Sequence, residues 1–361
     1  IVGLMELLRF VPFLLIMILT LAMPANAQVN GSSHKNKNSS GAATQADEQL
    51  AREFYNNKDY GKAKELNLSL YRTNYNSYNF SMYIECLIRL SEYDEAIAAM
   101  KSYLRKHPDE WKVNVDLGYM YKLQGDNDKA DKHFRKIIKD VSDAKNSIVA
   151  VANLFRSRNL NEYALALYEK GAANPNNDSH FYLEKAYAYN SMLDFANATD
   201  CYLNYLEETP EQYEMIKTRI RFMFYYDIDG SVADIIRTAL LAKAQANPEN
   251  EQFAELLVWF SLQTEDYDIA LTFELALDRR KGDRENDILY LADIAADNKR
   301  YEIAISAYKY VTAKGEAGVY FIKAQTSLFK IEYEKALAEQ IDDKKYYEKL
   351  SDGSAAAGLL C

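Results

Sequence analysis

The sequence predicts an all-helical protein assembled from repeated helical hairpins, and three observations carry that prediction. Its 361 residues include only 13 Gly and 6 Pro, about 5% against roughly 12% in average proteins. That is too few for a turn-rich β-sandwich, a collagen or a Pro/Gly-rich disordered chain. Apolar residues make up 48%, enough for a substantial core if the 29 tyrosines are partly buried. Finally, one short phrase recurs with a period of 34 residues, which favours one elongated array over two or three separate domains.

The N-terminal residues resemble a secretory leader. Arg9 precedes the apolar run Phe10–Met23, which is shorter than the roughly 18 to 20 residues that span a bilayer. Ala25–Ala27 supplies an A-x-A cleavage signal, so residues 1–27 are predicted to be a signal peptide, with Met5 as the start of translation. An uncleaved anchor or a buried helix is the alternative. No Cys follows the cleavage point, which argues against a lipoprotein.

Residues 28–46 are rich in Ser, Asn and Gly with almost no apolar content, and this composition predicts a disordered linker. The mature protein is therefore expected to be exported, periplasmic or secreted from a bacterium, without an integral membrane span after signal cleavage.

Three cysteines, Cys86, Cys201 and Cys361, follow. Export permits disulfides, but an odd number at no framework spacing predicts none. Cys86 and Cys201 fall inside helical apolar patterns and are expected to be buried thiols.

The recurring phrase is an aromatic residue followed three positions later by alanine. The alanines Ala63, Ala96, Ala130, Ala164 and Ala198 are separated by 33, 34, 34 and 34 residues, with Asn127 and Asn161 in two of the aromatic positions. Ala270 and Ala304 are again 34 apart. The interval of 72 from Ala198 to Ala270 fits one diverged repeat with one extra helical turn and Val232 in the alanine position.

Each repeat contains two apolar stripes at helical spacing. In the third repeat Leu117, Gly118 and Tyr121 share one face, the turn at residues 125–127 follows, and Ala130, Phe134 and Ile137 share a second face. Neither helix can bury its stripe alone, so neighbouring hairpins are expected to stack.

This pattern resembles the tetratricopeptide repeat, whose first helix carries a large residue, Leu, Gly/Ala and Tyr, and whose second carries Ala, an aromatic and Ala. The clearest matches are Phe80, Ala96, Met100 and Pro108, then Leu117, Gly118, Tyr121, Ala130 and Phe134, then Ala152, Phe155, Ala164 and Tyr168, then Tyr182, Ala186, Tyr189, Ala198, Tyr202 and Pro210. Weaker matches are Leu257 with Ala270, and Leu291, Ala292, Ala304 and Tyr308.

The resemblance implies a right-handed superhelical solenoid of about eight to nine repeats over residues 47–340. Two repeats depart from the pattern. Asn67 stands where the first repeat should have an aromatic, and Arg219 and Ile220 replace the usual Leu and Gly/Ala in the sixth repeat, Glu211–Pro248. We expect the sixth repeat to bend or offset the superhelix, with Ser231 and Asp234 capping its second helix.

A solenoid needs a polar end, and residues 341–361 are expected to supply a capping helix at Asp342–Leu350. The remainder of the tail resembles a truncated end.

No catalytic motif is present: the sequence contains no H-E-x-x-H, G-x-S-x-G, Walker loop or paired C-x-x-C. His34, His107, His133 and His180 are scattered, with His133 on an outward helix face, so neither a metal nor a cofactor is expected. Residues 227–231 are similar to part of a calcium loop, but Thr238 occupies the position of the terminal Glu. A turn between helices is the better interpretation. We therefore do not expect an enzyme.

The family resemblance implies that first helices line a ligand groove. The positions carried over are Tyr78, Glu85, Arg89, Lys112, Tyr119, Lys122, Asn153, Arg156, Tyr187, Asn190, Arg221, Tyr225, Trp259, Tyr290 and Asp293. Aromatic side chains in this set suit peptide recognition because they offer large contact area at low entropic cost. The alternative is that they only pack between adjacent first helices. The Lys/Asn and Lys/Arg set that grips C-terminal carboxylates in some family members is incomplete here.

The function expected from these features is that of a protein–protein interaction scaffold of the cell envelope. It would hold a partner peptide or helix in the groove, and family analogy suggests envelope assembly or secretion. The alternative is a carbohydrate- or nutrient-binding helical protein, because tyrosine and tryptophan also stack on sugars. The net charge of −10 argues against a nucleic-acid partner. The oligomeric state stays open.

Overall fold

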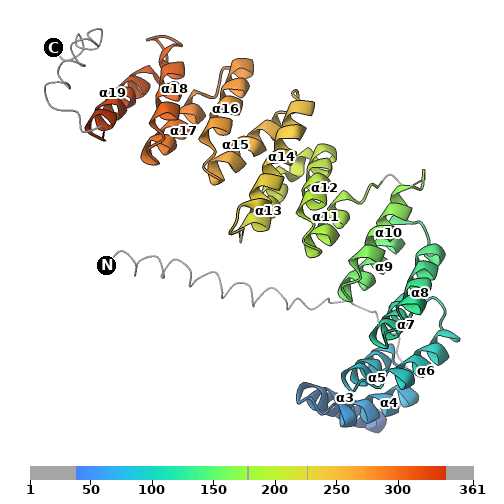
Figure 1. Cartoon of the computed structure of the whole chain (residues 1–361). Coiled ribbons are helices and arrows are strands. Elements are labelled where there is room, and N and C mark those ends of the chain that lie inside the picture. Colours follow the sequence, from blue (N-terminus) through green and yellow to red (C-terminus); the bar gives the residue numbers. More distant parts are fainter. Residues whose placement is uncertain (1–37, 177–178, 226, 339–361) are drawn as a thin grey trace. The chain divides into compact units, whose positions relative to one another are not determined.

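The computed structural model describes residues 38–176, 179–225 and 227–338, and in this part of the chain every regular element is helical (Figure 1). The α-helices are α3 (Asn38–Asn56), α4 (Tyr60–Asn74), α5 (Ser77–Arg89), α6 (Tyr93–Leu104), α7 (Trp111–Leu123), α8 (Asn127–Asp140), α9 (Lys145–Ser157), α10 (Asn161–Ala172), α11 (Tyr182–Ser191), α12 (Phe195–Glu208), α13 (Tyr213–Phe224), α14 (Ser231–Ala246), α15 (Glu251–Gln263), α16 (Tyr267–Lys281), α17 (Glu285–Asp297), α18 (Tyr301–Thr312) and α19 (Phe321–Ala338). A short 3₁₀ turn, η1 (Pro210–Gln212), precedes α13. The fold class is therefore all-α, as the sequence predicts.

The chain divides into two compact units at Glu92 and Tyr93. In the first, α4 packs between α3 and α5. In the second, α6 packs on α7, and six complete hairpins follow from α7–α8 to α17–α18. The first helices α7, α9, α11 and α13 lie on one side of this unit in Figure 1, and the second helices α8, α10, α12 and α14 lie on the other.

The alanine series marks the tightest contacts of the array. Ala63, Ala96, Ala164, Ala198, Ala270 and Ala304 are all 0% exposed, and Ala130 is 3% exposed. Val232, in the alanine position of the sixth repeat, is 9% exposed. A small residue on the second helix lets the paired helices approach closely, so the repeat period is set by packing.

Each regular hairpin turn contains one residue with a left-handed backbone. These residues are Lys58, Ser91, Gly125, Asn159, Leu193, Glu265 and Lys299, with φ between 56° and 84°. Each stands five residues before the buried alanine of its repeat. Only Gly125 is a glycine, the residue that adopts this conformation without a steric penalty. The turn geometry is therefore imposed by stacking of the hairpins more than by local sequence.

Replacing Leu193 by glycine is expected to raise the free energy of unfolding. Leu193 has φ 60° and a side chain 73% exposed, so the change relieves strain and loses little packing. The left-handed conformation costs a non-glycine residue roughly 1–2 kcal/mol, and added freedom of the unfolded chain offsets about 0.5–1 kcal/mol of the gain. Urea unfolding should show a net gain of about 0.5–1 kcal/mol. Leu193→Ala keeps Cβ and should show none, and equal values for the two variants would contradict the strain.

The aromatic position of the second helix fills the space between hairpins. Phe134 and Tyr168 are 0% exposed, and Tyr202 and Tyr308 are 1% and 2% exposed. A Cβ built on Gly118 of α7 would lie 2.3 Å from Cε1 of Phe134, so only glycine fits at that crossing. In the first repeat, Asn67 is buried in this position and its Nδ2 donates to the Ala63 carbonyl at 2.8 Å.

The hairpin α13–α14 departs from its neighbours, as the sequence predicts. The preceding helix α12 packs more extensively on α14 than on α13, and α13 makes few contacts with α14. Ile220 occupies the position that Gly118 holds in the third repeat and is fully buried. Its bulk excludes the close crossing that glycine permits.

The predicted cap of α14 is wrong in detail. Ser231 is the first residue of the helix, and Gly230 is its N-cap. Asp227 and Asp229 do the capping: their carboxylates accept from the backbone N–H of Ala233 at 2.7 Å and of Ser231 at 3.1 Å. These bonds make residues 227–231 a turn between helices, as expected in preference to a calcium loop.

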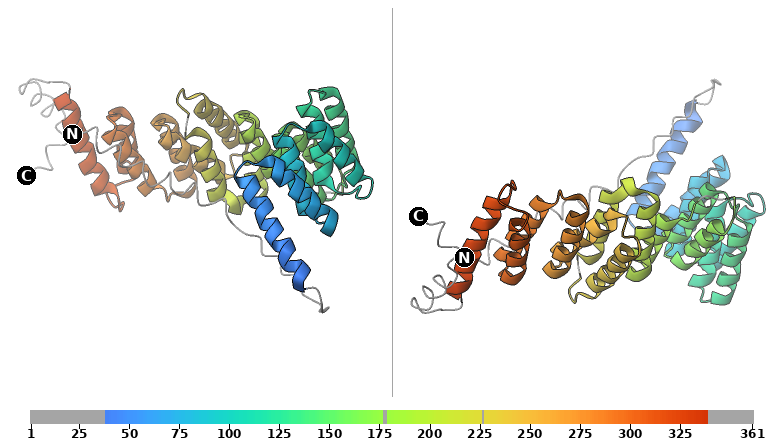
Figure 2. Two further views of the ribbon diagram at one scale, coloured as in Figure 1. Left: turned by 90° about the horizontal axis from the view of Figure 1, so that it is seen from below. Right: turned by 90° about the horizontal axis from the view of Figure 1, so that it is seen from above.

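Two boundaries differ from the sequence-based expectation. Helix α3 begins at Asn38, inside the stretch predicted as linker, where Ala42, Ala43 and Ala46 favour helix. Helix α19 runs from Phe321 to Ala338 without a turn and lies beside α18 as a single helix (Figure 2). Tyr333 therefore does not mark a hairpin, because the buried Ile331 continues the helical stripe of Ala324 and Leu328. The predicted signal peptide 1–27, residues 28–37 of the linker and the end segment 341–361 lie outside the described residues.

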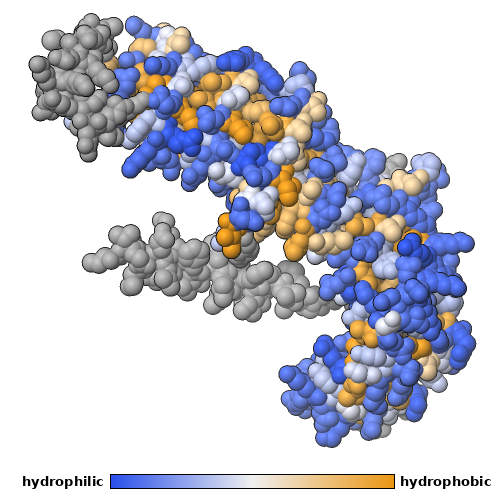
Figure 3. Space-filling model, in the orientation of Figure 1, coloured by the Kyte–Doolittle hydropathy of each residue, from blue (hydrophilic) through white to orange (hydrophobic). Residues whose placement is uncertain are grey.

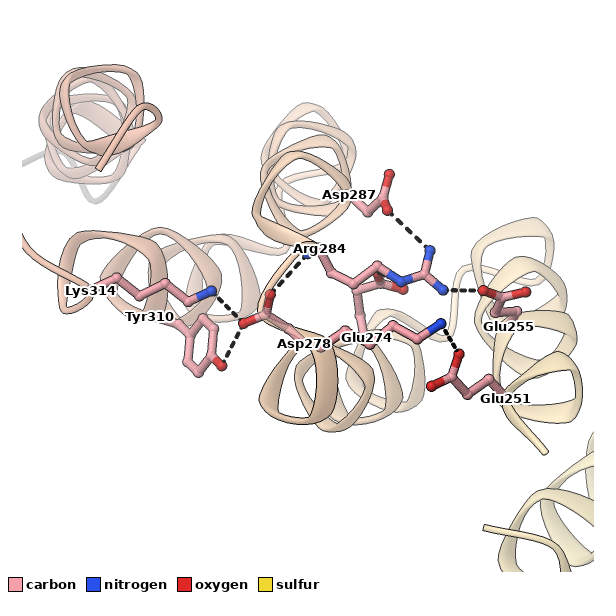
Figure 4. Close-up of polar contacts among 9 residues, drawn as sticks. Glu251, Glu255, Glu274, Asp278, Arg284, Asp287, Tyr310 and Lys314 are labelled. Carbon is pink, nitrogen blue, oxygen red and sulfur yellow. Dashed lines mark hydrogen bonds and ion pairs between the residues drawn. The ribbon is translucent and has the colours of Figure 1, made fainter. Parts of the chain in front are cut away.

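An ionic network joins α15, α16, α17 and α18 (Figure 4). Asp278 is 2% exposed; it accepts from the Tyr310 hydroxyl at 2.8 Å and pairs with Nζ of Lys314 at 2.5 Å. Arg284 contacts Glu255 and Asp287, and its Nε lies 3.8 Å from Oε1 of Glu274. Glu274 is 3% exposed, and burial raises its pKa to about 7.

Candidate binding surface

Cationic and aromatic side chains alternate along the first helices of the second unit. The Arg158 guanidinium lies 5.3 Å from the centre of the Tyr119 ring. Arg156 and Arg219 lie 5.8 Å and 5.1 Å from the Tyr187 ring. Lys217 and Arg221 lie 5.5 Å and 5.4 Å from the Trp259 ring. We call these eight residues the arginine–aromatic row.

The row crosses the helices because stacking sets their faces in register. Tyr119 is on α7, Arg156 on α9, Tyr187 on α11, Arg219 on α13 and Trp259 on α15. Each cation therefore reaches a ring on a neighbouring first helix. Tyr187 and Trp259 are held from behind: Tyr187 meets Tyr202 edge-on at 6.2 Å, and Trp259 contacts Phe224 at 6.3 Å.

The cations of the row differ in their ion pairing. Arg158 pairs with the buried Asp116 at 2.8 Å, and Lys217 lies 3.5 Å from Glu214. Within the described residues, Arg156, Arg219 and Arg221 have no carboxylate partner. The Nη1 of Arg156 reaches Oδ1 of Asn153 at 3.4 Å, while its Nε is buried and unbonded in the described structure. Three uncompensated positive charges thus lie together in a chain of net charge −10.

Apolar side chains accompany these charges on α13. Phe222 is 66% exposed and Tyr225, the residue after the helix, is 57% exposed. Figure 3 shows apolar residues reaching the surface over α13, beside hydrophilic ones. The helix turns its buried side, Ile216 and Ile220, into the core, so Phe222 lies on the side that faces solvent.

Five of the predicted groove residues belong to the row: Tyr119, Arg156, Tyr187, Arg221 and Trp259. Their contacts show packing between first helices, which is the alternative to ligand binding, and leave three guanidinium groups available as well. Whether any predicted residue binds a ligand stays a prediction.

The remaining predicted residues are spread over the array. Lys112, Lys122 and Asn153 are exposed or half-buried, and Asn190 is half-buried. Tyr290 is 61% exposed, and Asp293 accepts from the Tyr308 hydroxyl at 2.5 Å. In the first unit, Tyr78 is 49% exposed, and Nε of Arg89 lies 3.2 Å from Oε1 of Glu85.

Sequence reasoning missed Arg158, Lys217 and Arg219 as members of the row. In the sequence, Arg219 stands out only as a departure from the repeat pattern. Its spacing of two residues from Arg221 is the available signal, because on one helix such a pair points toward the helices on either side. Arg219 turns to Tyr187 on α11 and Arg221 to Trp259 on α15.

Other features of the described residues carry less. A hollow of about 940 Å³ is lined by Asp143, His180, Tyr182 and Glu208 among others, but it adjoins residues 177–178. No group of three or more His, Cys, Asp or Glu in the described segments could hold a metal. His133 is not on an outward face as predicted: it is half-buried, with Nε2 3.0 Å from the Asn114 carbonyl on α7. Cys86 and Cys201 are buried free thiols, as predicted.

Within the described residues, none of the helices combines the length and apolar character that crossing a membrane requires.

Comparison of the sequence with protein-family models gives no match, and comparison with curated proteins gives none either. Similar solved structures include a tetratricopeptide repeat protein from Parabacteroides merdae, with 11% identity, TM-score 0.28, and coverage of 80% of this chain and 100% of that one. The C-terminal part of a repeat-containing protein from Cytophaga hutchinsonii has 15% identity, TM-score 0.32, and coverage of 76% and 98%. The TPR2AB domain of yeast Sti1, in complex with pHSP90, has 13% identity, TM-score 0.26, and coverage of 74% and 99%.

The hairpin architecture of this chain is established by its own helix pairs and not by those scores. Buried alanines at a period of 34 residues, left-handed turns five residues before them and aromatic residues between the helices recur through the array. The chain is an all-α array of tetratricopeptide-like helical repeats.

Proposed function

We propose that this protein is a scaffold that binds a protein partner along the first helices of its second unit. The observation that carries the proposal is the arginine–aromatic row, in which Arg156, Arg219 and Arg221 lie over aromatic rings without a carboxylate partner among the described residues. Aromatic and arginine side chains dominate the binding energy of protein interfaces. No residue of the row is a nucleophile or a general base held against a second catalytic group, so binding is the chemistry that this surface supports.

Trp259 favours a protein ligand over the carbohydrate alternative. Lys217 and Arg221 lie over its ring, and Phe224 and Phe260 pack at 6.3 Å and 6.4 Å. Stacking of a sugar would have to displace these cations, whereas a peptide carboxylate can pair with them in place.

Site-specific photo-crosslinking tests the scaffold function. With p-benzoylphenylalanine in place of Phe222, the full-length protein in its native envelope fraction should give a discrete crosslinked product with another protein. The same photoreactive residue in place of Lys139, which is exposed on the second helix α8, is the matched control and should give none. The triple variant Arg156→Gln, Arg219→Gln, Arg221→Gln should reduce the Phe222 product at least tenfold, because buried contacts of arginine are worth about 2 kcal/mol or more each. Equal crosslinking from both positions, or a product unchanged in the triple variant, would contradict this assignment.

We also propose that the protein is exported and works in the cell envelope or outside the cell. The support is the sequence of residues 1–27, with its apolar run and A-x-A signal. Expression in a bacterial host should give a mature chain that begins at Gln28, as read by N-terminal sequencing. A mutant with Ala27→Trp should accumulate uncleaved, since the cleavage site requires a small residue. A mature protein that keeps residues 10–23 would show an anchor instead.

A further inference from the structure

We infer that the partner segment is acidic, with at least two carboxylates that pair with the unpaired arginines of the row and an apolar side chain that covers α13. This inference rests on the proposed function and specifies the chemistry of the ligand. It concerns Arg156, Arg219, Arg221, Phe222 and Tyr225.

The spacing of the guanidinium groups suits carboxylates on one short segment. Arg156 and Arg219 lie 5.8 Å and 5.1 Å from the centre of the same Tyr187 ring, one from α9 and the other from α13. Carboxylates two or three residues apart on an extended chain are separated by roughly 7 to 10 Å. Arg221, two residues from Arg219, extends the same line toward α15.

The local electrostatics leave these three groups without compensation. Elsewhere in the described residues, half-buried cations have carboxylate partners: Arg158 pairs with Asp116, Lys243 with Glu207 and Lys314 with Asp278. Arg156 is half-buried, and its Nε is buried without a hydrogen-bond acceptor in the described part of the chain. An unpaired buried cation is costly, and charge-assisted bonds to a carboxylate are among the strongest that a guanidinium makes. A ligand carboxylate would remove this cost.

Phe222 and Tyr225 distinguish a protein segment from other anions. They expose 66% and 57% of their surface next to the arginines, and an apolar side chain of a peptide can cover them. A nucleic acid would meet repulsion from the rest of the chain, whose net charge is −10, and such partners require an excess of Lys and Arg over the whole contact. The structure therefore points to an acidic peptide segment that also carries an aromatic or aliphatic residue.

Selection from a random library of 12-residue peptides tests this inference with the full-length protein. The selected peptides should be enriched in Asp and Glu two or three residues apart, and should contain an aromatic or aliphatic residue. Their affinity should fall at least tenfold when the acidic residues are changed to Asn and Gln, and at least tenfold for the triple variant Arg156→Gln, Arg219→Gln, Arg221→Gln. The control triple variant Lys132→Gln, Lys136→Gln, Lys139→Gln changes net charge equally on α8 and should bind normally. Circular dichroism confirms that each variant is folded.

The outcomes separate the two proposals. Selected peptides that crosslink to position 222 but lack acidic residues overturn the acidic segment and leave the scaffold function intact. Acidic peptides that bind both triple variants equally weakly show only a response to net charge, which also overturns the inference. Single-stranded oligonucleotides of matched charge that bind with the same dependence on the three arginines identify the surface as a general anion site and overturn it too. If no peptide is selected, the inference fails, and the envelope crosslinking decides the scaffold function separately.

Discussion

Replacing Phe134 by alanine is expected to lower the free energy of unfolding by about 3–5 kcal/mol, the range found when a fully buried phenylalanine is truncated. Phe134 is 0% exposed, meets Phe155 edge-on at 5.5 Å and lies 4.6 Å from the Tyr163 ring. It joins hairpin α7–α8 to hairpin α9–α10, so its loss opens a cavity at the interface that couples two repeats. Urea unfolding followed by circular dichroism measures the total loss, and hydrogen exchange of amides in α7 and α8 locates it. A loss below about 1 kcal/mol would contradict this packing.

Gly118→Ala supplies a test of the same contact from the opposite helix. Its new Cβ would lie 2.3 Å from Phe134 and 3.0 Å from His133, and overpacking of this kind costs about 1–3 kcal/mol. In the Phe134→Ala background the ring is absent, so the cost should fall by at least about 1 kcal/mol, as expected for residues in contact.

Gly61→Ala is the matched control for Gly118→Ala. A Cβ at Gly61 of α4 meets nothing within 4 Å, so this helical glycine should gain up to about 1 kcal/mol when replaced by alanine. Equal effects at the two glycines, or additive effects of Gly118→Ala and Phe134→Ala, would show that the close crossing is absent in solution.

Glu274→Gln is expected to make the protein more stable at pH 8 and to leave it unchanged at pH 5. Burial raises the pKa of Glu274 to about 7, and Asp287 and Glu255 raise it further against the opposing effect of Arg284. A carboxyl group with a raised pKa holds its proton in the folded state when the unfolded chain has lost it. Stability therefore falls as the pH rises from the unfolded pKa, near 4.5, through 7.

The expected difference at pH 8 is about 2–3 kcal/mol, since one unit of pKa corresponds to about 1.4 kcal/mol. Glutamine keeps the shape of the side chain, and Arg284 keeps Glu255 and Asp287 as partners. Denaturant unfolding at several pH values between 5 and 8 measures the effect, with Glu162→Gln on the exposed side of α10 as the control. Parallel pH profiles for wild type and Glu274→Gln would contradict the buried, raised-pKa state.

Asp278 in the same network should act in a different pH window. Burial alone would raise its pKa, but Lys314, the Arg284 backbone and Tyr310 outweigh burial and lower it. Its stabilising contribution is thus present above pH 3.8 and is lost as the pH falls through the lowered pKa. This loss does not overlap the fall between pH 5 and 8 that we assign to Glu274.

Sequence patterns predicted the repeat because packing demands small residues at fixed intervals. Ala63, Ala96 and Ala130 could be aligned without coordinates, and their burial confirms the register. Phe134, Tyr168 and Tyr202 were likewise predicted as core residues from the helical period. The end of the array was harder to predict, since Tyr333 and Ala336 repeat the phrase inside one uninterrupted helix.

The candidate site was only partly predictable. Family resemblance placed Arg156, Tyr187 and Trp259 on first helices, but it could not pair them, because each contact joins residues from different hairpins. Arg219 lay outside the expected groove positions and still reaches Tyr187. Displacement of α13, which follows from the bulk of Ile220 and the altered packing on α12 and α14, is a property of three helices together.

The sequence by itself determined the helical period, the 34-residue repeat and the residues that face the core, because these depend on local geometry and on burial of apolar side chains. Only the tertiary structure decided which cations meet which rings, which arginines stay without carboxylates and which acids are buried. Those outcomes depend on the angle and offset between stacked hairpins, and side chains far apart in sequence meet only after the hairpins have packed.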